Sequence, residues 1–497
     1  MQVKAKTNKI NKTKLSVQTT AYPRSLAAQI KHKEETTFPA FDTGRLGALL
    51  DGWHVWDSWF VMTEDGQVAD INGHRVLIAL VRPVEGDTGG SGEKIAFFYS
   101  ADGVHYTHGG FLFEQSIYDD IREWSGSTIK RDDGRIQTFY TISNGVVIDG
   151  VWQTNQRFAT AIQTLEFTPA ETVNDGISSY TTEAKLVATA PEVHVLLKEP
   201  DGVLYETAAQ ASAHENRFPC LHDRSRGSDQ TENFCFRDPK FFRDPKSGKK
   251  FLFFEGNTGK GDNKVGVIKE EYTGEEDFDP TSDDIKANGC VGVIELTNDE
   301  YTFGVFHEPL LVANTTTDEI ERINVIYDSG YYYLFVCGHL NKFTTSNDDP
   351  EQINVDVMLG FRSKELLGHY KPLNDDGCVI RQKSFGAPYA GQDANRQYVY
   401  SWLMVPTGTP GVFECISYAN YCQVDGEIVA VKTSGPTVMV EIKGGYTRIL
   451  DLKYNILPKG LVDAASVTAT ENVSHETSDG SESAAASDDA SGLFSTH

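Results

Sequence analysis

Short runs of β-branched and aromatic residues recur along this chain, and residues typical of turns separate them. Val, Ile, Tyr and Phe favour strands, whereas Gly, Asn, Asp and Pro favour the turns between them. The clearest runs are HRVLIALVRP at 74–83, KIAFFYS at 94–100, RIQTFYTIS at 135–143, KKFLFFEGNTG at 249–259, GYYYLFVCGHL at 330–340 and RQYVYSWLMV at 396–405. The pattern predicts an all-β protein and leaves a sandwich, a barrel and a propeller open. One short segment, IYDDIREW at 117–124, is a candidate helix.

The composition shifts near both ends of the chain. Residues 1–35 hold lysines but no acid before Glu34, and no apolar stretch of the kind that a secretory signal needs, so we expect a loosely ordered leader there. From residue 466 the chain becomes rich in Ser, Ala and Asp, which predicts a disordered tail over 466–497. The folded domain that carries the site is therefore expected over 36–465.

The net charge narrows the classes of partner. Asp and Glu number 71 against 45 Lys and Arg, a formal charge of -26, which repels nucleic acid but not a neutral sugar. No window approaches the roughly 18 consecutive apolar residues of a membrane-spanning helix. We expect neither a nucleic-acid nor a membrane partner. The seven cysteines form no CxxC pair, so a disulfide framework is not expected.

A first candidate site residue is Asp57, in the segment DGWHVWDSW at 51–59, which holds three of the six tryptophans. Aromatic faces stack on the apolar faces of sugar rings, and a carboxylate among them suits attack on an anomeric carbon. The alternative is a core strand in which Asp57 is hydrogen-bonded.

A second candidate is Asp238, which follows Arg237 and precedes a proline that favours extended backbone before it. A near copy, Arg243-Asp244-Pro245, leads into the turn-forming sequence KSGKK, whereas Asp238 directly precedes the strand-like KFF. We therefore expect Asp238 in the site and Asp244 in a hairpin.

A third candidate is the segment DEIER at 318–322. On a strand, Glu319 and Glu321 would share one face and Arg322 would lie on the other. Two carboxylates on one face raise each other's pKa, so one can stay protonated and act as an acid. The alternative is a solvated charge cluster. Paired carboxylates with aromatic platforms, without metal-ligand spacing, indicate a glycosidase-type site.

These segments, in this order, resemble the levansucrase and inulosucrase family, glycoside hydrolase family 68, from about residue 45 to about residue 455. WDSW at 56–59 is similar to the family's nucleophile motif, RDP at 237–239 to its transition-state stabiliser, and DEIER to its acid/base motif. EWSGS at 123–127 and FEGNTG at 254–259 are further matches.

The resemblance implies a five-bladed β-propeller of four-stranded antiparallel blades with a funnel-shaped central active site. It implies Asp57 as nucleophile, Glu321 as general acid/base and Asp238 as transition-state stabiliser. The substrate-binding residues that it implies are Trp56, Trp124, Ser125, Arg237, Glu319, Arg322 and His339.

The implied reaction is cleavage of sucrose with transfer of the fructosyl unit to a growing fructan, to sucrose or to water through a covalent fructosyl-enzyme. Retention of configuration predicts the carboxyls of Asp57 and Glu321 about 5–5.5 Å apart. The rivals are a mainly hydrolytic, invertase-like β-fructofuranosidase and a non-catalytic carbohydrate-binding propeller.

Other properties follow only from the resemblance. His339 stands where many Gram-positive relatives carry arginine and Gram-negative relatives often carry histidine, so the linkage of the product is not implied. The segment after Asn257 is short beside relatives that hold a structural calcium, so no cofactor is expected and calcium is the alternative. The expected partners are sucrose and fructan or oligosaccharide acceptors, and the chain is expected to be monomeric and extracellular.

Overall fold

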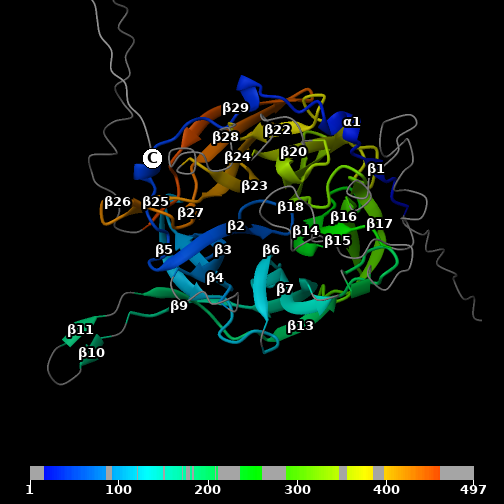
Figure 1. Ribbon diagram of the computed structural model, residues 1–497. Coiled ribbons are helices and arrows are strands. Elements are labelled where there is room, and N and C mark those ends of the chain that lie inside the picture. The colour runs from blue at the N-terminus through cyan, green and yellow to red at the C-terminus, as the bar shows by residue number, and fades with distance from the viewer. Residues whose placement is uncertain are drawn as a thin grey trace, which may run out of the picture. The chain divides into compact units, whose positions relative to one another are not determined.

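The computed structural model consists almost entirely of β-strands, which confirms the predicted fold class in its coarse form (Figure 1). It describes residues 16–84, 92–119, 121–148, 151–170, 172–174, 179–181, 184–207, 209–210, 235–259, 287–345, 355–383 and 397–458. The tail predicted to be disordered, 466–497, lies outside these residues. The described residues belong to one unit, Met1–Lys459.

The first eight long strands form two antiparallel sets. The first set is β2 (Trp53–Thr63), β3 (Arg75–Pro83), β4 (Lys94–Ser100) and β5 (His105–Phe111). The second is β6 (Arg122–Lys130), β7 (Ile136–Ile148), β8 (Val151–Gln163) and β13 (Val193–Lys198). Parallel pairing of β2 with β6 joins the two sets, and β30 (Leu457–Pro458) pairs parallel with β5. The candidate helix at 117–124 is wrong, because β6 begins at Arg122.

Three more antiparallel sets follow in chain order. The third is β14 (Phe236–Arg243), β15 (Lys250–Asn257), β16 (Gly289–Leu296) and β17 (Gly304–Val312), with β1 (Thr20–Ala21) parallel to β17. The fourth is β18 (Glu321–Asp328), β19 (Tyr331–His339) and β20 (Asp356–Ser363), with β21 (Lys371–Pro372) and β22 (Cys378–Arg381) both on β20. The fifth is β23 (Val399–Pro406), β24 (Val412–Ala419), β28 (Thr437–Lys443) and β29 (Tyr446–Lys453), with β27 (Thr433–Ser434) on β24.

The remaining elements are short. Three two-stranded ribbons pair β9 (Leu165–Thr168) with β12 (Lys185–Ala188), β10 (Thr172–Asn174) with β11 (Ser179–Thr181), and β25 (Cys422–Val424) with β26 (Glu427–Val429). The helical turns are α1 (Arg24–Ala27), η1 (Glu34–Thr36), η2 (Thr43–Arg45) and η3 (Leu340–Lys342). In the part of the chain that the structure describes, none of the helices has the length and apolar character to span a membrane.

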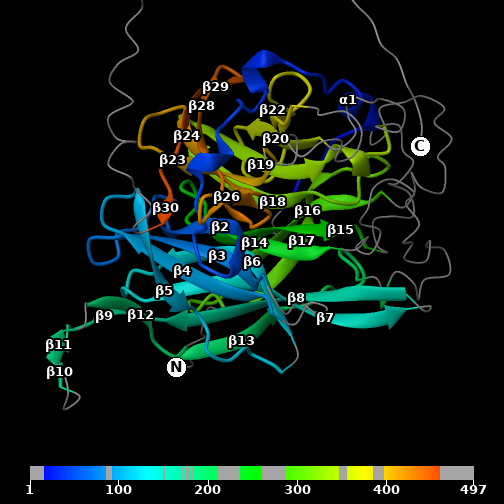
Figure 2. The ribbon, with the colours of Figure 1, turned by 60° about the vertical axis from the view of Figure 1, so that its left-hand side comes forward.

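The first strand of each set contacts the first strand of the next: β2 contacts β6, β6 contacts β14, β14 contacts β18, β18 contacts β23, and β23 contacts β2. We call these five strands the inner ring. Figure 1 and Figure 2 both show them toward the middle of the unit, with the later strands of each set outside them. Residues far apart in the sequence therefore meet at the inner ring.

Apolar side chains fill the spaces between neighbouring sets. Residues 76–81 of β3 are all buried, because neighbouring elements cover both faces of that strand. Between the second and third sets, the Phe139 and Phe241 rings stack with centroids 5.6 Å apart, and those of Phe158 and Phe236 stack at 4.0 Å. Each buried phenylalanine contributes about 1.5–3 kcal/mol by leaving water. This packing holds the inner strands in position.

The expectation of a loosely ordered leader over 1–35 does not hold for residues 16–35. β1 pairs with β17, and Tyr22, Ala27 and Ile30 join the apolar cluster that includes residues of the third and fourth sets. Tyr22 is 1% exposed, and its hydroxyl donates to the Asp376 carbonyl at 3.1 Å. The expectation rested on the lysine content of the segment. Its few apolar residues nevertheless bury enough surface to order residues 16–35.

The cysteines agree with the expectation of no disulfide framework within the described residues. The six cysteines among these residues are buried and are not in disulfides: Cys235, Cys290, Cys337, Cys378, Cys415 and Cys422. Cys220 lies outside those residues.

Candidate active site

Each strand of the inner ring departs from regular pairing near its start. The register shifts lie between Val55 and Ser58, Trp124 and Gly126, Arg237 and Lys240, Glu321 and Asn324, and Tyr400 and Leu403. A bulge redirects side chains that a regular strand would send to opposite faces. The three predicted catalytic acids all stand at these irregularities.

Asp238, Arg322 and Ser401 occupy matching places in β14, β18 and β23, directly after the residue where the register shift begins. All three have left-handed backbone, with φ of 58°, 55° and 62°. This conformation costs a residue other than glycine about 1–3 kcal/mol and persists only where the surroundings hold it in place. In β14 it lets Arg237 and Asp238, which are neighbours in sequence, both contact residues of the site.

Asp238 is held from three strands. Its Oδ1 accepts from the Ser125 hydroxyl, its Oδ2 accepts from the Arg322 backbone N–H at 3.0 Å, and its own N–H donates to Thr141 Oγ1 at 3.1 Å. Burial raises the pKa of Asp238, and the nearby Asp57 carboxylate raises it further. The Arg322 and Arg237 guanidiniums and the Ser125 hydrogen bond oppose that rise and favour the carboxylate form. The Asp57 carboxylate is thus close enough for its charge to act on Asp238.

Arg237 connects β14 to the acid/base segment. Its Nε donates to Glu255 Oε2 at 2.7 Å, and its Nη2 lies 2.8 Å from Glu321 Oε1 and 3.4 Å from Glu319 Oε1. Glu255 is fully buried, and its Oε1 accepts from the Ile320 N–H at 3.1 Å. Glu255 therefore holds the Arg237 guanidinium, and it also holds the backbone at Ile320, the residue between Glu319 and Glu321.

Glu319 and Glu321 have opposite protonation preferences. Burial raises the pKa of Glu321 to about 7, the charge of Glu319 adds to the rise, and Arg237 opposes it. Burial alone would also raise the pKa of Glu319, but the Lys342 ammonium, Arg237 and His339 lower it to about 2. Glu321 can therefore be protonated at neutral pH while Glu319 stays ionised. The predicted strand does not extend to Glu319, since β18 begins at Glu321.

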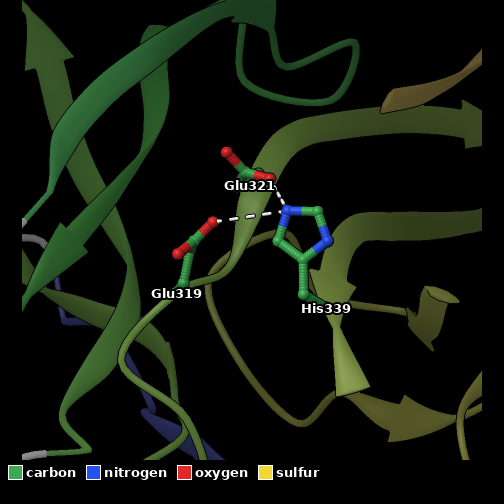
Figure 3. A group of neighbouring side chains, drawn as sticks. All are labelled: Glu319, Glu321 and His339. Atoms are coloured by element: carbon green, nitrogen blue, oxygen red, sulfur yellow. Dashed lines mark ion pairs between the residues drawn. The ribbon is translucent and has the colours of Figure 1, made fainter. Parts of the chain in front are cut away.

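His339, at the end of β19, faces both glutamates (Figure 3). Its Nε2 lies 3.7 Å from Glu319 Oε1 and 3.5 Å from Glu321 Oε2. Candidate ligand atoms of these three residues lie within 4.8 Å of one another. Arg237 and Lys342 already supply positive charge there, which disfavours a bound cation. The arrangement suits proton transfer.

The aromatic platforms lie beside the acids. Trp56 is half-buried on β2, with Arg82 Cζ 5.6 Å and Lys432 Nζ 5.4 Å from its ring centroid. Asp57, next to it, is half-buried. Burial raises the pKa of Tyr418, and the charges of Asp57 and Glu321 raise it further. On β6, Trp124 is half-buried and precedes Ser125. Asp57 is near enough to Asp238 to raise its pKa, and Arg237, the neighbour of Asp238, contacts Glu321, so the three acids lie in one region.

Arg322 differs from its predicted role. Its side chain is buried, and its Nη2 donates to the Ser58 carbonyl at 2.6 Å, while its backbone N–H binds Asp238. Both contacts are to protein groups that fix the inner ring. The structure therefore places Arg322 as a support of β2 and Asp238, where the sequence predicted a substrate contact.

Comparison with known proteins identifies the family. A family model described as Levansucrase/Invertase matches residues 5–455 of this chain. The chain belongs to this levansucrase and invertase family. It is 30% identical over 462 residues to the levansucrase of Bacillus amyloliquefaciens, which covers 86% of this chain and 87% of that protein.

Solved structures of levansucrase-family proteins have a similar fold. A Bacillus subtilis levansucrase variant in complex with oligosaccharides is 27% identical, with a TM-score of 0.71 over 88% of this chain and 97% of that one. An inulosucrase from Halalkalicoccus jeotgali bound to kestose is 28% identical, with a TM-score of 0.66 over 88% of this chain and 96% of that one.

Sequence reasoning missed four residues of this levansucrase-type site. Tyr400 on β23 donates to Glu321 Oε2, and Asp356 on β20 binds His339. Glu255 binds Arg237, and Lys342 binds Glu319. Glu255 stands within the matched segment FEGNTG, which offered a signal. Nothing local marked the other three, because their roles come from contacts between different elements.

Proposed function

We propose that this chain is a retaining fructosyltransferase that cleaves sucrose and transfers the fructosyl unit to a growing fructan, to sucrose or to water. The observation that carries the proposal is the convergence of Asp57, Asp238 and Glu321 at the inner ring, with the pKa of Glu321 near 7. Membership of the levansucrase and invertase family supports the substrate class.

The proposed architecture is a five-bladed β-propeller with a central funnel. It is supported by the five antiparallel sets in chain order and by the closed circuit of contacts around the inner ring. The parallel pair of β30 with β5 ties the end of the described chain back to its first set, as a closed ring of blades requires. The site residues lie near the starts of the inner strands, which supports a funnel that opens at that end.

The first half of the reaction breaks the glycosidic bond of sucrose. Protonated Glu321 gives its proton to the glycosidic oxygen, and glucose leaves with that oxygen and proton. The Asp57 carboxylate attacks the fructosyl anomeric carbon and forms a covalent ester. Ionised Glu319 keeps negative charge beside Glu321, which favours the protonated form of Glu321 before the reaction.

The second half transfers the fructosyl unit. Glu321, now a carboxylate, removes a proton from an acceptor hydroxyl or from water, and the acceptor oxygen displaces Asp57 from the anomeric carbon. Two displacements at one carbon retain its configuration. The predicted separation of about 5–5.5 Å between the Asp57 and Glu321 carboxyls is the geometry that this sequence of steps requires.

Asp238 is proposed to bind the fructosyl hydroxyls more tightly as the ring approaches an oxocarbenium ion. Its bonds to Ser125 and Arg322 fix the carboxylate in advance, so little reorganisation is needed. Trp56 and Trp124 are proposed to pack against the sugar, and Arg237, Glu319 and His339 to line the site around the glycosidic bond.

Hydrolysis is the nearest alternative, because the same intermediate can pass to water. Invertase-like families usually carry an acid/base glutamate followed by cysteine, and this chain holds one Glu-Cys pair, at Glu414-Cys415. It lies on β24, where the Glu414 carboxylate is 3.7 Å from Arg75 and Cys415 is buried. Neither residue is among the groups around Glu321, so this pair does not favour the hydrolytic reading.

Measuring glucose and free fructose after incubation with sucrose tests the proposal. Transfer predicts more glucose than free fructose, with the difference recovered in oligosaccharide or polymer. Equal amounts would assign the chain to hydrolysis, and no release of either would reduce it to a binding protein. We further propose a monomer that acts outside the cell and needs no cofactor, for which the family resemblance is the support.

A further inference from the structure

Asp356, the first residue of β20, is a buried carboxylate whose partner is a histidine of the site. It is 4% exposed, and its Oδ1 lies 2.5 Å from His339 Nδ1. Among the described residues its other oxygen, Oδ2, is buried without a hydrogen-bond partner. A buried carboxylate is costly unless an opposite charge compensates it. The His339 ring is the group placed to do so.

The His339 ring is fixed in orientation from three sides. Asp356 binds Nδ1, while Nε2 on the opposite edge faces Glu319 and Glu321 (Figure 3). The Tyr400 ring stacks on the imidazole with centroids 4.2 Å apart and planes at 25°. Tyr400 also donates its hydroxyl to Glu321 Oε2. The imidazole therefore stands between a buried carboxylate and the acid/base pair.

Further charged groups meet at the same place from other elements. Arg237 of β14 contacts both Glu319 and Glu321, and Lys342 of η3 contacts Glu319. Glu255 of β15 binds the Arg237 guanidinium directly, with Oε2 2.7 Å from Nε. Asp57 of β2 acts at longer range, where its charge adds to the effect of burial in raising the pKa of Tyr418. Of the cations, Arg237 and Lys342 titrate far above neutral pH, whereas a histidine can change its charge in the working range.

We propose that Asp356 is a positioning residue that holds the His339 ring as an imidazolium against Glu321 and so tunes the protonation of the acid/base. The inference rests on the proposed role of Glu321. It assigns Asp356 an effect on the reaction without contact with sugar, since Asp356 acts through His339.

The sign of the effect follows from the charges. Burial lowers the pKa of His339, but Asp356, Glu319 and Glu321 raise it to about 9, so the ring is cationic at neutral pH. That cation, 3.5 Å from Glu321 Oε2, holds down the pKa of Glu321. When Asp356 is neutral, His339 loses its proton at lower pH. The pKa of Glu321 then rises, and Glu321 stays protonated to higher pH.

The test is the pH dependence of kcat/KM for glucose release from sucrose by the full chain. Its alkaline limb reports the loss of the essential acid from the free enzyme. In Asp356→Asn the limb should move up by about one pH unit, because a charge near Glu321 is removed. His339→Gln removes the same charge directly and should move the limb in the same direction.

The double variant distinguishes an action through His339 from a general disturbance. If Asp356 acts through His339, Asp356→Asn should add little to the shift already present in His339→Gln. An unmoved limb in Asp356→Asn, or an equal further shift in the His339→Gln background, would overturn the proposal. If Asp356→Asn does not fold, an unmoved limb in His339→Gln overturns it equally.

A matched control exists on the surface. The side chains of Asp102 and of His105, the first residue of β5, form the same type of pair, with Nδ1 2.6 Å from Oδ2, but both side chains are exposed. Asp102→Asn should leave the alkaline limb unchanged. Glu321→Gln separates this inference from the proposed function: near-normal sucrose cleavage by Glu321→Gln removes the acid/base assignment, whatever Asp356→Asn does.

Discussion

Asp238 and Arg322 are joined across two strands of the inner ring by a hydrogen bond of 3.0 Å from the Arg322 backbone N–H to Asp238 Oδ2, and both residues have left-handed backbone. The N–H of Arg322 that binds Asp238 comes from the bulged part of β18. The carboxylate that is proposed to stabilise the transition state is therefore held by the backbone of the strand that carries the acid/base.

Asp238→Asn tests that role. The amide keeps the shape but loses the negative charge, so kcat should fall by about 100-fold or more with the fold retained. The control is Asp244→Asn in the near copy RDP, where Asp244 accepts from Tyr332 Oη and Ser247 in a hairpin. It should lower thermal stability and leave kcat within a few-fold. Similar kcat losses in the two variants would contradict the assignment of Asp238.

Asp57→Asn tests the nucleophile. Without a carboxylate the covalent fructosyl-enzyme cannot form, so sucrose cleavage should drop by about 10⁴-fold or more. Asp51→Asn, in the same segment but exposed, is the matched control and should cleave sucrose normally. The measurement is initial glucose release with saturating sucrose. Retained turnover in Asp57→Asn would remove the double-displacement mechanism.

The pH profile should follow Glu321. Because burial raises its pKa to about 7, kcat/KM should fall as pH rises through about 7, where Glu321 loses the proton that it must donate. The Tyr400 hydroxyl binds the ionised form and lowers that pKa. Tyr400→Phe should therefore move the alkaline limb to higher pH. A shift toward lower pH would mean that the group titrating in this limb is not Glu321.

Ser401 allows a test of stored backbone strain. It has φ of 62°, is 2% exposed, and its buried hydroxyl has no hydrogen-bond partner among the described residues. Ser401→Gly relieves the left-handed conformation and should raise the free energy of unfolding by up to about 1 kcal/mol. Ser401→Ala removes the hydroxyl but keeps the strain. Urea unfolding should therefore rank Gly above Ala, and the reverse order would show that the strain is negligible.

Tyr22 tests the order of the N-terminal segment. Tyr22→Ala should cost about 3–5 kcal/mol of unfolding free energy, as truncation of a buried aromatic residue does. Tyr22→Phe loses only the hydrogen bond to the Asp376 carbonyl and should cost about 1 kcal/mol. Thermal or urea unfolding measures both. If neither variant changes stability, the segment contributes nothing to the fold.

Local sequence was sufficient to predict the strands, because β-branched and aromatic runs between turn residues favour extended backbone wherever they occur. It also singled out Asp57, Asp238 and the pair Glu319 and Glu321 as candidates, and the family resemblance predicted the roles of Asp57, Asp238 and Glu321. It distinguished Asp238 from Asp244 through the residues that follow each. The segment 117–124 failed as a helix because the pairing of β6 with β7 overrides a weak local preference.

Tertiary structure decided the rest. Tyr400 acts on Glu321 because β23 and β18 meet at the inner ring, whereas Asp356 binds His339 across the paired strands β19 and β20, and Lys342 of η3 binds Glu319. The left-handed backbone of Asp238 and Arg322 likewise stands where contacts between strands hold it, since such a conformation is costly for residues other than glycine. Residue type determined which groups could carry charge, and packing between distant strands determined which of them are buried together, and hence which hold a proton at neutral pH.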